Sequence, residues 1–338
     1  MSGKPKIADI RPRAGIVGGE VSIRGTGFAS ANGHRPRVSF GGVEGTVVVG
    51  SDSFLVAKVP EGAASGDLVV STNSVCSEGT SFEVGVTIAE NLHPVSNPAL
   101  DASGNIYCTF SGSRGQKVPV SLYQVDLNYN LKPFVSDLMN PTGLAFDRSG
   151  LLYVSSRYDG TIYRVTPAGA ASTFAEGMGI ATGLAFDEDD NLYVGDRSGT
   201  IFKISPEKQI FVFATLEPSI AAYHLAFGPG GNLFVTGPTT SSFDSIHRIS
   251  RNGEVSVYYR GLGRPQGMAF EETGDMLVAA SLGGRKGIVR VTQDAKAELA
   301  VSGAGLVGLA FFGKALVLAS SNSLYYLNWG LRGRPLLG

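Results

Sequence analysis

One pattern recurs six times, at intervals of about 40 residues, between residue 92 and the C-terminus. Each copy opens with a short strand such as Gly-Leu-Ala-Phe, passes through a polar turn and continues in an aromatic and aliphatic strand. The opening strands are 97–100, 143–146, 183–186, 224–227, 267–270 and 308–311. Repeats of this length with several short strands each are typical of a β-propeller, in which every repeat forms a four-stranded blade. The sequence therefore predicts an all-β chain with a six-bladed propeller.

The last repeat is incomplete, and the segment before the first repeat supplies what it lacks. Only three strand segments follow residue 305, at 306–311, 315–319 and 323–327. A segment similar to the fourth strands of the other repeats lies at 86–92. We expect 86–92 to form the outer strand of the last blade. Such pairing joins the two ends of the propeller and removes an open sheet edge.

The N-terminal region does not share the repeat. Residues 6–84 contain about seven short alternating strands separated by Gly and Pro turns, which is typical of a small β-sandwich. The sequence therefore predicts two domains, 1–84 and 85–338. Only one or two residues separate the last sandwich strand from the segment at 86–92, so we expect the domains to move as one body.

The sandwich region resembles the IPT/TIG family of immunoglobulin-like domains. Gly25-Thr-Gly-Phe28, Val38-Ser-Phe-Gly-Gly42 and Val59-Pro60 carry the resemblance, and they occur in the order that the family shows. The resemblance implies an immunoglobulin-like module that acts as a spacer, scaffold or interaction unit. Some members bind DNA through loops and partner domains. No loop rich in Arg and Lys occurs here, so that role is not expected.

Charge and cysteine content restrict the partners and the compartment. The formal net charge is −1 with acidic and basic residues interleaved, which predicts no nucleic-acid partner. No run approaches the roughly 18 apolar residues of a membrane-spanning helix, so no membrane insertion is expected. Two cysteines, Cys76 and Cys108, are too few for a disulfide scaffold, so free thiols are expected. The chain as given begins without an apolar leader, which predicts a cytoplasmic protein. It would be exported if an upstream leader had been removed.

The propeller region resembles NHL-repeat and gluconolactonase-like six-bladed propellers. Pro141-Thr-Gly-Leu-Ala-Phe-Asp147 followed by Leu152-Tyr-Val154 carries this resemblance. Proteins of these families include lactonases, lyases and non-catalytic binding platforms. The resemblance implies a site where loops meet the central channel. Gluconolactonase and paraoxonase relatives bind a calcium ion there through Asn, Asp and Glu side chains.

Residues before the opening strands do not match that calcium site. The corresponding positions hold Ser96, Thr142, Thr182, Tyr223, Gln266 and Val307. Calcium needs six or more oxygen ligands, usually including carboxylates, and none of these residues is Asp, Glu or Asn. We therefore expect no cofactor and no metal. Calcium held by an atypical site that includes Asp196 is the alternative.

A second ring of polar residues follows the second strands of the repeats. Arg157 and Arg197 occupy equivalent places in adjacent repeats, and Asp196 precedes Arg197. Two guanidinium groups in these places can hold a carboxylate or a phosphate. Alternatively, Asp196 pairs with a neighbouring arginine and caps a turn.

Two of the four histidines lie near the expected channel. His224 follows Tyr223 at the start of the fourth opening strand, and His93 lies in the loop before the first. The pair can supply general base chemistry, or both can be packing or surface residues. His34 and His247 have no predicted role.

These features favour a non-catalytic binding or scaffold protein that recognises a protein partner or a small polar ligand, within a larger assembly. The alternatives are a lactonase-like hydrolase using Tyr223, His224 and Asp196 with an atypical metal, and a lyase using His93 and His224. The tail at 332–337 is a candidate docking element. Candidate ligand-binding residues are Thr142, Arg157, Thr182, Asp196, Arg197, Tyr223, His224 and Gln266.

Overall fold

The computed structural model describes residues 4–29, 35–241 and 243–334. His34 and residues 335–337 of the candidate docking tail lie outside this range. Within it the chain forms 33 β-strands and one short 3₁₀ turn at Pro229–Gly231. No helix in the described part is long and apolar enough to cross a membrane. The all-β prediction is therefore confirmed.

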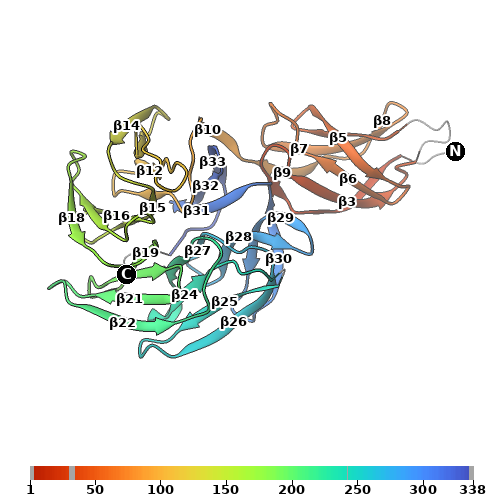
Figure 1. Ribbon diagram of the computed structural model, residues 1–338. Helices are drawn as coiled ribbons and strands as arrows, with labels where there is room; N and C mark the ends of the chain where they lie inside the picture. The colour runs from red at the N-terminus through yellow and green to blue at the C-terminus, as the bar shows by residue number, and fades with distance from the viewer. Residues whose placement is uncertain (1–3, 30–34, 242, 335–338) are drawn as a thin grey trace.

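The N-terminal domain is built from nine short strands around one apolar core (Figure 1). Phe28, Phe40 and Phe82 are fully buried at its centre, and the rings of Phe40 and Phe82 meet edge to face at 5.1 Å. Strand β3 alternates buried and exposed residues, as expected for a sheet with one face against a core. The strands are β1 (Lys6–Arg11), β2 (Ala14–Gly15), β3 (Glu20–Thr26), β4 (Arg37–Phe40), β5 (Val43–Gly50), β6 (Phe54–Lys58), β7 (Gly66–Thr72), β8 (Val75–Cys76) and β9 (Thr80–Val84).

The repeats form four-stranded antiparallel sheets, and the strands of each run in chain order from the channel outward. The first two sheets contain β11 (Ala99–Leu100), β12 (Ile106–Thr109), β13 (Leu122–Val125) and β14 (Leu131–Val135), and then β15 (Pro141–Phe146), β16 (Leu152–Ser156), β17 (Ile162–Val165) and β18 (Ala171–Ala175). The next two contain β19 (Ala181–Phe186), β20 (Leu192–Asp196), β21 (Thr200–Ile204) and β22 (Ile210–Thr215), and then β23 (His224–Phe227), β24 (Leu233–Thr236), β25 (Asp244–Ile249) and β26 (Val255–Leu262).

A fifth separate sheet closes the ring of the propeller. It contains β31 (Leu306–Phe312), β32 (Ala315–Ser320) and β33 (Ser323–Asn328), with β10 (Val86–Glu90) as its outer strand. Strand β10 pairs antiparallel with β33, from Val86 opposite Tyr326 to Glu90 opposite Ser323. The predicted closing strand is therefore confirmed, although it ends at Glu90 and not at residue 92.

The remaining repeat is not a separate blade. Its strands are β27 (Met268–Phe270), β28 (Met276–Leu282), β29 (Arg285–Val291) and β30 (Ala297–Ser302). They belong to a thirteen-stranded sheet that continues through β2 into the N-terminal domain. The structure thus has five separate blades, and the expectation of six is wrong in this respect. The physical reason is the edge of β30, whose unpaired backbone groups bond to β2.

Strand β2 also fixes the two domains against each other. It runs parallel to β9 on one side and to β30 on the other. Ile16, which follows it, is 1% exposed and packs in the core of the propeller, and its amide donates to the Ser302 carbonyl at 2.9 Å. A Cβ atom at Gly19 would lie 2.5 Å from that same carbonyl oxygen, so the close approach requires glycine. This continuous sheet supports the expectation that the domains move together.

The repeated Phe of the opening strands packs between neighbouring repeats. Phe146 meets Tyr107 with ring centroids 5.4 Å apart, and Phe186 meets Tyr153 at 4.9 Å. Phe227 and Tyr193 form the equivalent pair at 5.1 Å. Such aromatic pairs each stabilise a fold by about 0.5–1.5 kcal/mol beyond the area that they bury. The repeated Phe in the sequence therefore corresponds to the same aromatic contact at successive boundaries between repeats.

Candidate functional site

We call the strands of each repeat a to d, from the channel outward. The d–a and b–c loops gather at one end of the channel, where the sequence predicts a site. Several of the predicted polar residues are used there in contacts between repeats. Ser155 donates its hydroxyl to the carbonyl of Thr182, and Ser96 does the same for Thr142. The Thr182 hydroxyl donates to the Gly195 carbonyl at 2.9 Å and accepts the Tyr223 amide at 3.0 Å.

These contacts change the interpretation of the first predicted ring. Thr142 and Thr182 are each only 1% exposed. The Thr142 hydroxyl donates to the Asn140 carbonyl at 3.2 Å, and the Gln266 carbonyl accepts the Thr236 hydroxyl at 2.6 Å. Each threonine hydroxyl already donates its hydrogen to a backbone carbonyl, so it cannot donate a hydrogen bond to a ligand. We therefore do not retain Thr142 and Thr182 in the candidate site. Gln266 stays a predicted ligand-binding residue, because its bond to Thr236 runs through the backbone carbonyl and not through the side chain.

Asp196 caps a turn, but it lacks the arginine partner that this interpretation of the sequence also gave it. Its carboxylate accepts the amide of Ile180 at 2.8 Å and the amide of Ser198 at 3.2 Å, together with the Ser198 hydroxyl. It is 5% exposed, and it forms no ion pair with Arg197. No group of three or more His, Cys, Asp or Glu side chains within the described residues is arranged to hold a metal ion.

Tyr223 and His224 are buried beside the channel and are neutral near pH 7. Burial lowers the pKa of His224 to about 4. Burial raises the pKa of Tyr223 to about 12, with smaller contributions from the charges of Asp196 and Glu217. The Tyr223 hydroxyl donates to the Glu217 carbonyl. Because the Asp196 carboxylate is also engaged, these three residues do not present the metal-bearing site that a lactonase-like mechanism requires.

His93 lies far from His224 in the arrangement of strands. It belongs to the loop before β11, whereas His224 begins β23, three repeats further around the ring. His93 is exposed, hydrogen-bonds through Nδ1 to the Ser111 carbonyl and packs 6.2 Å from the ring of Phe110. The structure therefore does not bring the two predicted lyase residues together.

Three arginines do converge at this end of the channel. Arg157 donates from Nη2 to the Gly112 carbonyl at 2.7 Å, which places it beside the loop that carries Arg114. Its Nε is buried and has no hydrogen-bond partner in the described part of the chain. Burial lowers the pKa of Arg157, and the positive charges of Arg197 and Arg114 lower it further. Within the described ranges none of the three forms an ion pair with a carboxylate.

Asn140 holds this cluster in place. It is fully buried, and its side-chain amide donates to the carbonyls of Gly112 and Ser113 at 3.0 and 2.8 Å, while its oxygen accepts the Gly115 amide at 2.7 Å. The backbone amide of Arg157 donates to the Asn140 carbonyl at 3.2 Å. Sequence reasoning predicted Arg157 and Arg197 but missed Asn140 and Arg114. The available signal for Asn140 was its position just before the Pro141 motif.

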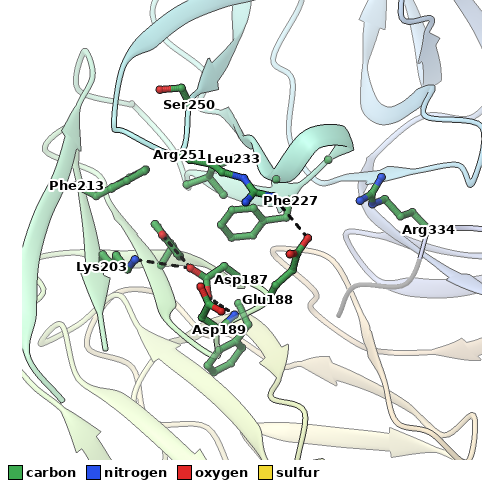
Figure 2. A pocket seen from close by; sticks show the side chains of 14 residues that line it. Asp187, Glu188, Asp189, Lys203, Phe213, Phe227, Leu233, Ser250, Arg251 and Arg334 are labelled. Carbon is green, nitrogen blue, oxygen red and sulfur yellow. Dashed lines mark hydrogen bonds and ion pairs between the residues drawn. The ribbon is translucent and has the colours of Figure 1, made fainter. Parts of the chain in front are cut away.

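The opposite end of the channel, where the a–b turns gather, contains a cavity of about 690 Å³. Its walls are largely apolar and come from the opening strands of all six repeats. Leu144, Leu184, Leu225, Met268 and Leu309 contribute, together with Arg332 and Arg334 from the C-terminal segment. A smaller cavity of about 180 Å³ lies between the turns of the third and fourth repeats (Figure 2). The sequence predicted no cavity at this end.

The N-terminal domain matches a known family. The family model described as IPT/TIG domain matches residues 5–84, as the resemblance in the sequence predicted. The chain therefore combines an IPT/TIG domain with a β-propeller. No similar sequence was found among curated proteins.

Solved structures are similar in fold to most or nearly all of this chain. An auxiliary nutrient binding protein from Bacteroides thetaiotaomicron VPI-5482 is 11% identical with a TM-score of 0.59, covering 97% of this chain and 98% of its own. A gluconolactonase from Xanthomonas campestris is 15% identical with a TM-score of 0.59, covering 72% and 88%. Virginiamycin B lyase from Staphylococcus aureus is 13% identical with a TM-score of 0.52, covering 83% and 93%. At these identities the likeness establishes the fold alone.

Proposed function

We propose that this protein is a non-catalytic binding protein whose propeller holds a small oxyanion, a carboxylate or a phosphate, between Arg114, Arg157 and Arg197. The observation that carries the proposal is the half-buried guanidinium of Arg157, whose Nε lacks a hydrogen-bond partner in the described residues. A buried donor without a partner costs about 1–3 kcal/mol. A bound oxyanion would supply that partner.

The charges around Arg157 support an anionic ligand over a neutral one. The positive charges of Arg197 and Arg114 act unfavourably on Arg157, and none of the three forms an ion pair with a described carboxylate. An oxyanion among them would gain charge-assisted hydrogen bonds, which are about twice as strong as neutral ones. The planar guanidinium also matches the two oxygens of a carboxylate or a phosphate.

The surrounding residues give less support to a catalytic role. Tyr223 and His224 are neutral at pH 7 and buried, and Asp196 caps its own turn. A structural neighbour that spans nearly the whole chain is described as an auxiliary nutrient binding protein, which agrees with a binding role. The expected protein partner and the scaffold role of the IPT/TIG domain stay predictions.

Isothermal titration calorimetry at constant ionic strength tests the proposal, with inorganic phosphate and succinate as separate probes. We expect saturable binding of at least one probe and a loss of about tenfold or more in affinity for Arg157→Gln and Arg197→Gln, since 1.4 kcal/mol corresponds to tenfold. Arg260→Gln, an exposed arginine on the outer strand β26, is the matched control and should bind as the unmodified protein does. Equal affinities of R157Q and R260Q, or the absence of saturable binding, would refute the oxyanion site.

A further inference from the structure

The cavity at the a–b end of the channel has the size and the walls of a ligand site. At about 690 Å³ it lies within the range of roughly 300–1,000 Å³ that small-molecule sites occupy. Leu144, Leu184 and Leu225 point into it from three successive repeats, and each is less than 10% exposed. Ligand sites are lined mainly by apolar side chains, so these walls suit an apolar group of a ligand.

Two arginines stand at the edge of this cavity on a segment that backbone hydrogen bonds fix. The Arg334 amide donates to the Phe270 carbonyl at 2.8 Å, and the Glu272 amide donates to the Arg332 carbonyl at 2.9 Å. Neither arginine forms an ion pair within residues 4–29, 35–241 and 243–334. Figure 2 shows Arg334 across from Phe227, and Arg334 lines both the large and the small cavity.

The acidic side chains nearby are already engaged. Asp101, the acid among the residues that line the large cavity, accepts hydrogen bonds from Ser103, Asn105 and Tyr107. In the small cavity Glu188 pairs with Arg251 at 3.9 Å and Asp187 lies 3.8 Å from the Lys203 ammonium. The donors to Asp101 are neutral, so Asp101 keeps its negative charge, but Arg332 and Arg334 outweigh it and the net charge of the residues that line the large cavity is positive.

We propose that this cavity binds an amphipathic anion, namely a single-chain carboxylate whose apolar chain lies among the leucines and whose head group meets Arg332 and Arg334. The proposal is independent of the oxyanion site between Arg114, Arg157 and Arg197, which lies at the other end of the channel. The apolar wall favours a ligand with a hydrocarbon chain, and the two guanidinium groups favour a negatively charged head group.

Calorimetry of the full chain with octanoate, decanoate and dodecanoate, each below its micelle concentration, tests the proposal. Burial of each additional CH₂ should raise affinity about fourfold until the cavity is filled. Arg334→Gln and Arg332→Gln should each weaken decanoate binding about fivefold or more, with little effect on 1-decanol. Ala145→Leu narrows the cavity and should weaken the binding of both decanoate and 1-decanol. Circular dichroism checks that this variant is folded.

Four comparisons make the test decisive. Arg157→Gln should keep its full affinity for decanoate, which separates this site from the oxyanion site. Decyltrimethylammonium should bind more weakly than decanoate, and equal or tighter binding would overturn the assignment of an anion. An affinity that does not depend on the length of the fatty-acid chain would overturn the assignment of the cavity as the binding site. If truncation after Arg334 raised the affinity for decanoate tenfold or more, residues 335–338 would be the natural occupant of the cavity, and the ligand role would be overturned.

Discussion

The indole Nε1 of Trp329 donates a hydrogen bond to the carboxylate of Glu271 at 2.9 Å. Glu271 is fully buried, and its second oxygen accepts a hydrogen bond from Arg290 at 2.8 Å. The backbone of Glu271 also forms a β-bridge with Gly333. One carboxylate thus connects the end of the last strand with the turn after β27, and it holds the segment that carries Arg332 and Arg334 at the channel.

Glu271→Ala should destabilise the fold strongly. Removing one partner of a buried ion pair typically costs about 3–5 kcal/mol, because the other charge is left buried. Arg290 keeps a second carboxylate, Asp275 at 2.8 Å, so we expect the lower end of this range. Urea unfolding followed by tryptophan fluorescence measures the change. Glu272→Ala, at the exposed neighbouring residue, should stay within about 0.5 kcal/mol, and an equal loss in both variants would contradict the role of Glu271.

Ile16→Ala tests whether the two domains are one folding unit. Ile16 leaves the N-terminal domain and is buried in the propeller core, so truncation should cost about 2–5 kcal/mol. We expect one cooperative unfolding transition in the unmodified protein, and in the variant either a lower midpoint or two separate transitions. Calorimetric scanning distinguishes these results. Val17→Ala is the control, because this side chain is 40% exposed. An unfolding midpoint of V17A as low as that of I16A would contradict the role of Ile16 in a rigid junction.

The repeat and the closing strand were predictable because they follow from local pattern. Strand periodicity places the Phe of each opening strand between neighbouring repeats, and an incomplete last repeat requires a strand from elsewhere. The fusion through β2 was not predictable. Ala14–Gly15 is too short to show a period, and its parallel pairing with β9 and β30 depends on the relative placement of two domains.

The candidate sites were predictable only where the repeat marks equivalent positions. Arg157 and Arg197 were found because they follow the same strand in adjacent repeats. Arg114 was missed because it lies in a b–c loop, 110–121, that is longer than those of the next three repeats, and contacts with Asn140 and Arg157 hold this loop in place. The sequence does not reveal that the hydroxyls of Thr142 and Thr182 are already bonded to backbone carbonyls, that of Thr142 to Asn140 two residues earlier and that of Thr182 to Gly195 on the neighbouring strand.

The two cysteines should differ sharply in reactivity. Burial raises the pKa of Cys108 to about 12, and Cys76 is exposed. Because the thiolate is the reactive form, Cys76 should react with a thiol reagent such as DTNB within minutes and Cys108 only on unfolding. Titration should therefore give about one thiol in the native protein and about two in guanidinium chloride. In Cys76→Ser the native reaction should vanish, and fast reaction of that variant would contradict the burial of Cys108.

The buried imidazole of His224 should make stability depend on pH. Its pKa in the folded protein is about 4, below the value of about 6.5 in an unfolded chain. Between these values the unfolded chain binds a proton that the folded chain does not, so stability rises with pH and is lost as the pH falls from about 6.5 to 4. The expected slope reaches about 1.4 kcal/mol per pH unit, or about 3 kcal/mol in total.

Urea unfolding at several pH values between 4 and 7 measures that slope, and His224→Gln should reduce it. Burial also lowers the pKa of His247, so a smaller slope of the same sign should remain in the variant. Tyr223→Phe is the matched control, because the neighbouring hydroxyl, with its pKa of about 12, does not titrate in this window. It should lower stability at every pH and leave the slope unchanged. An identical slope in H224Q and the unmodified protein would show that the pKa of His224 is the same in the folded and unfolded chain, which would contradict its burial in the channel wall.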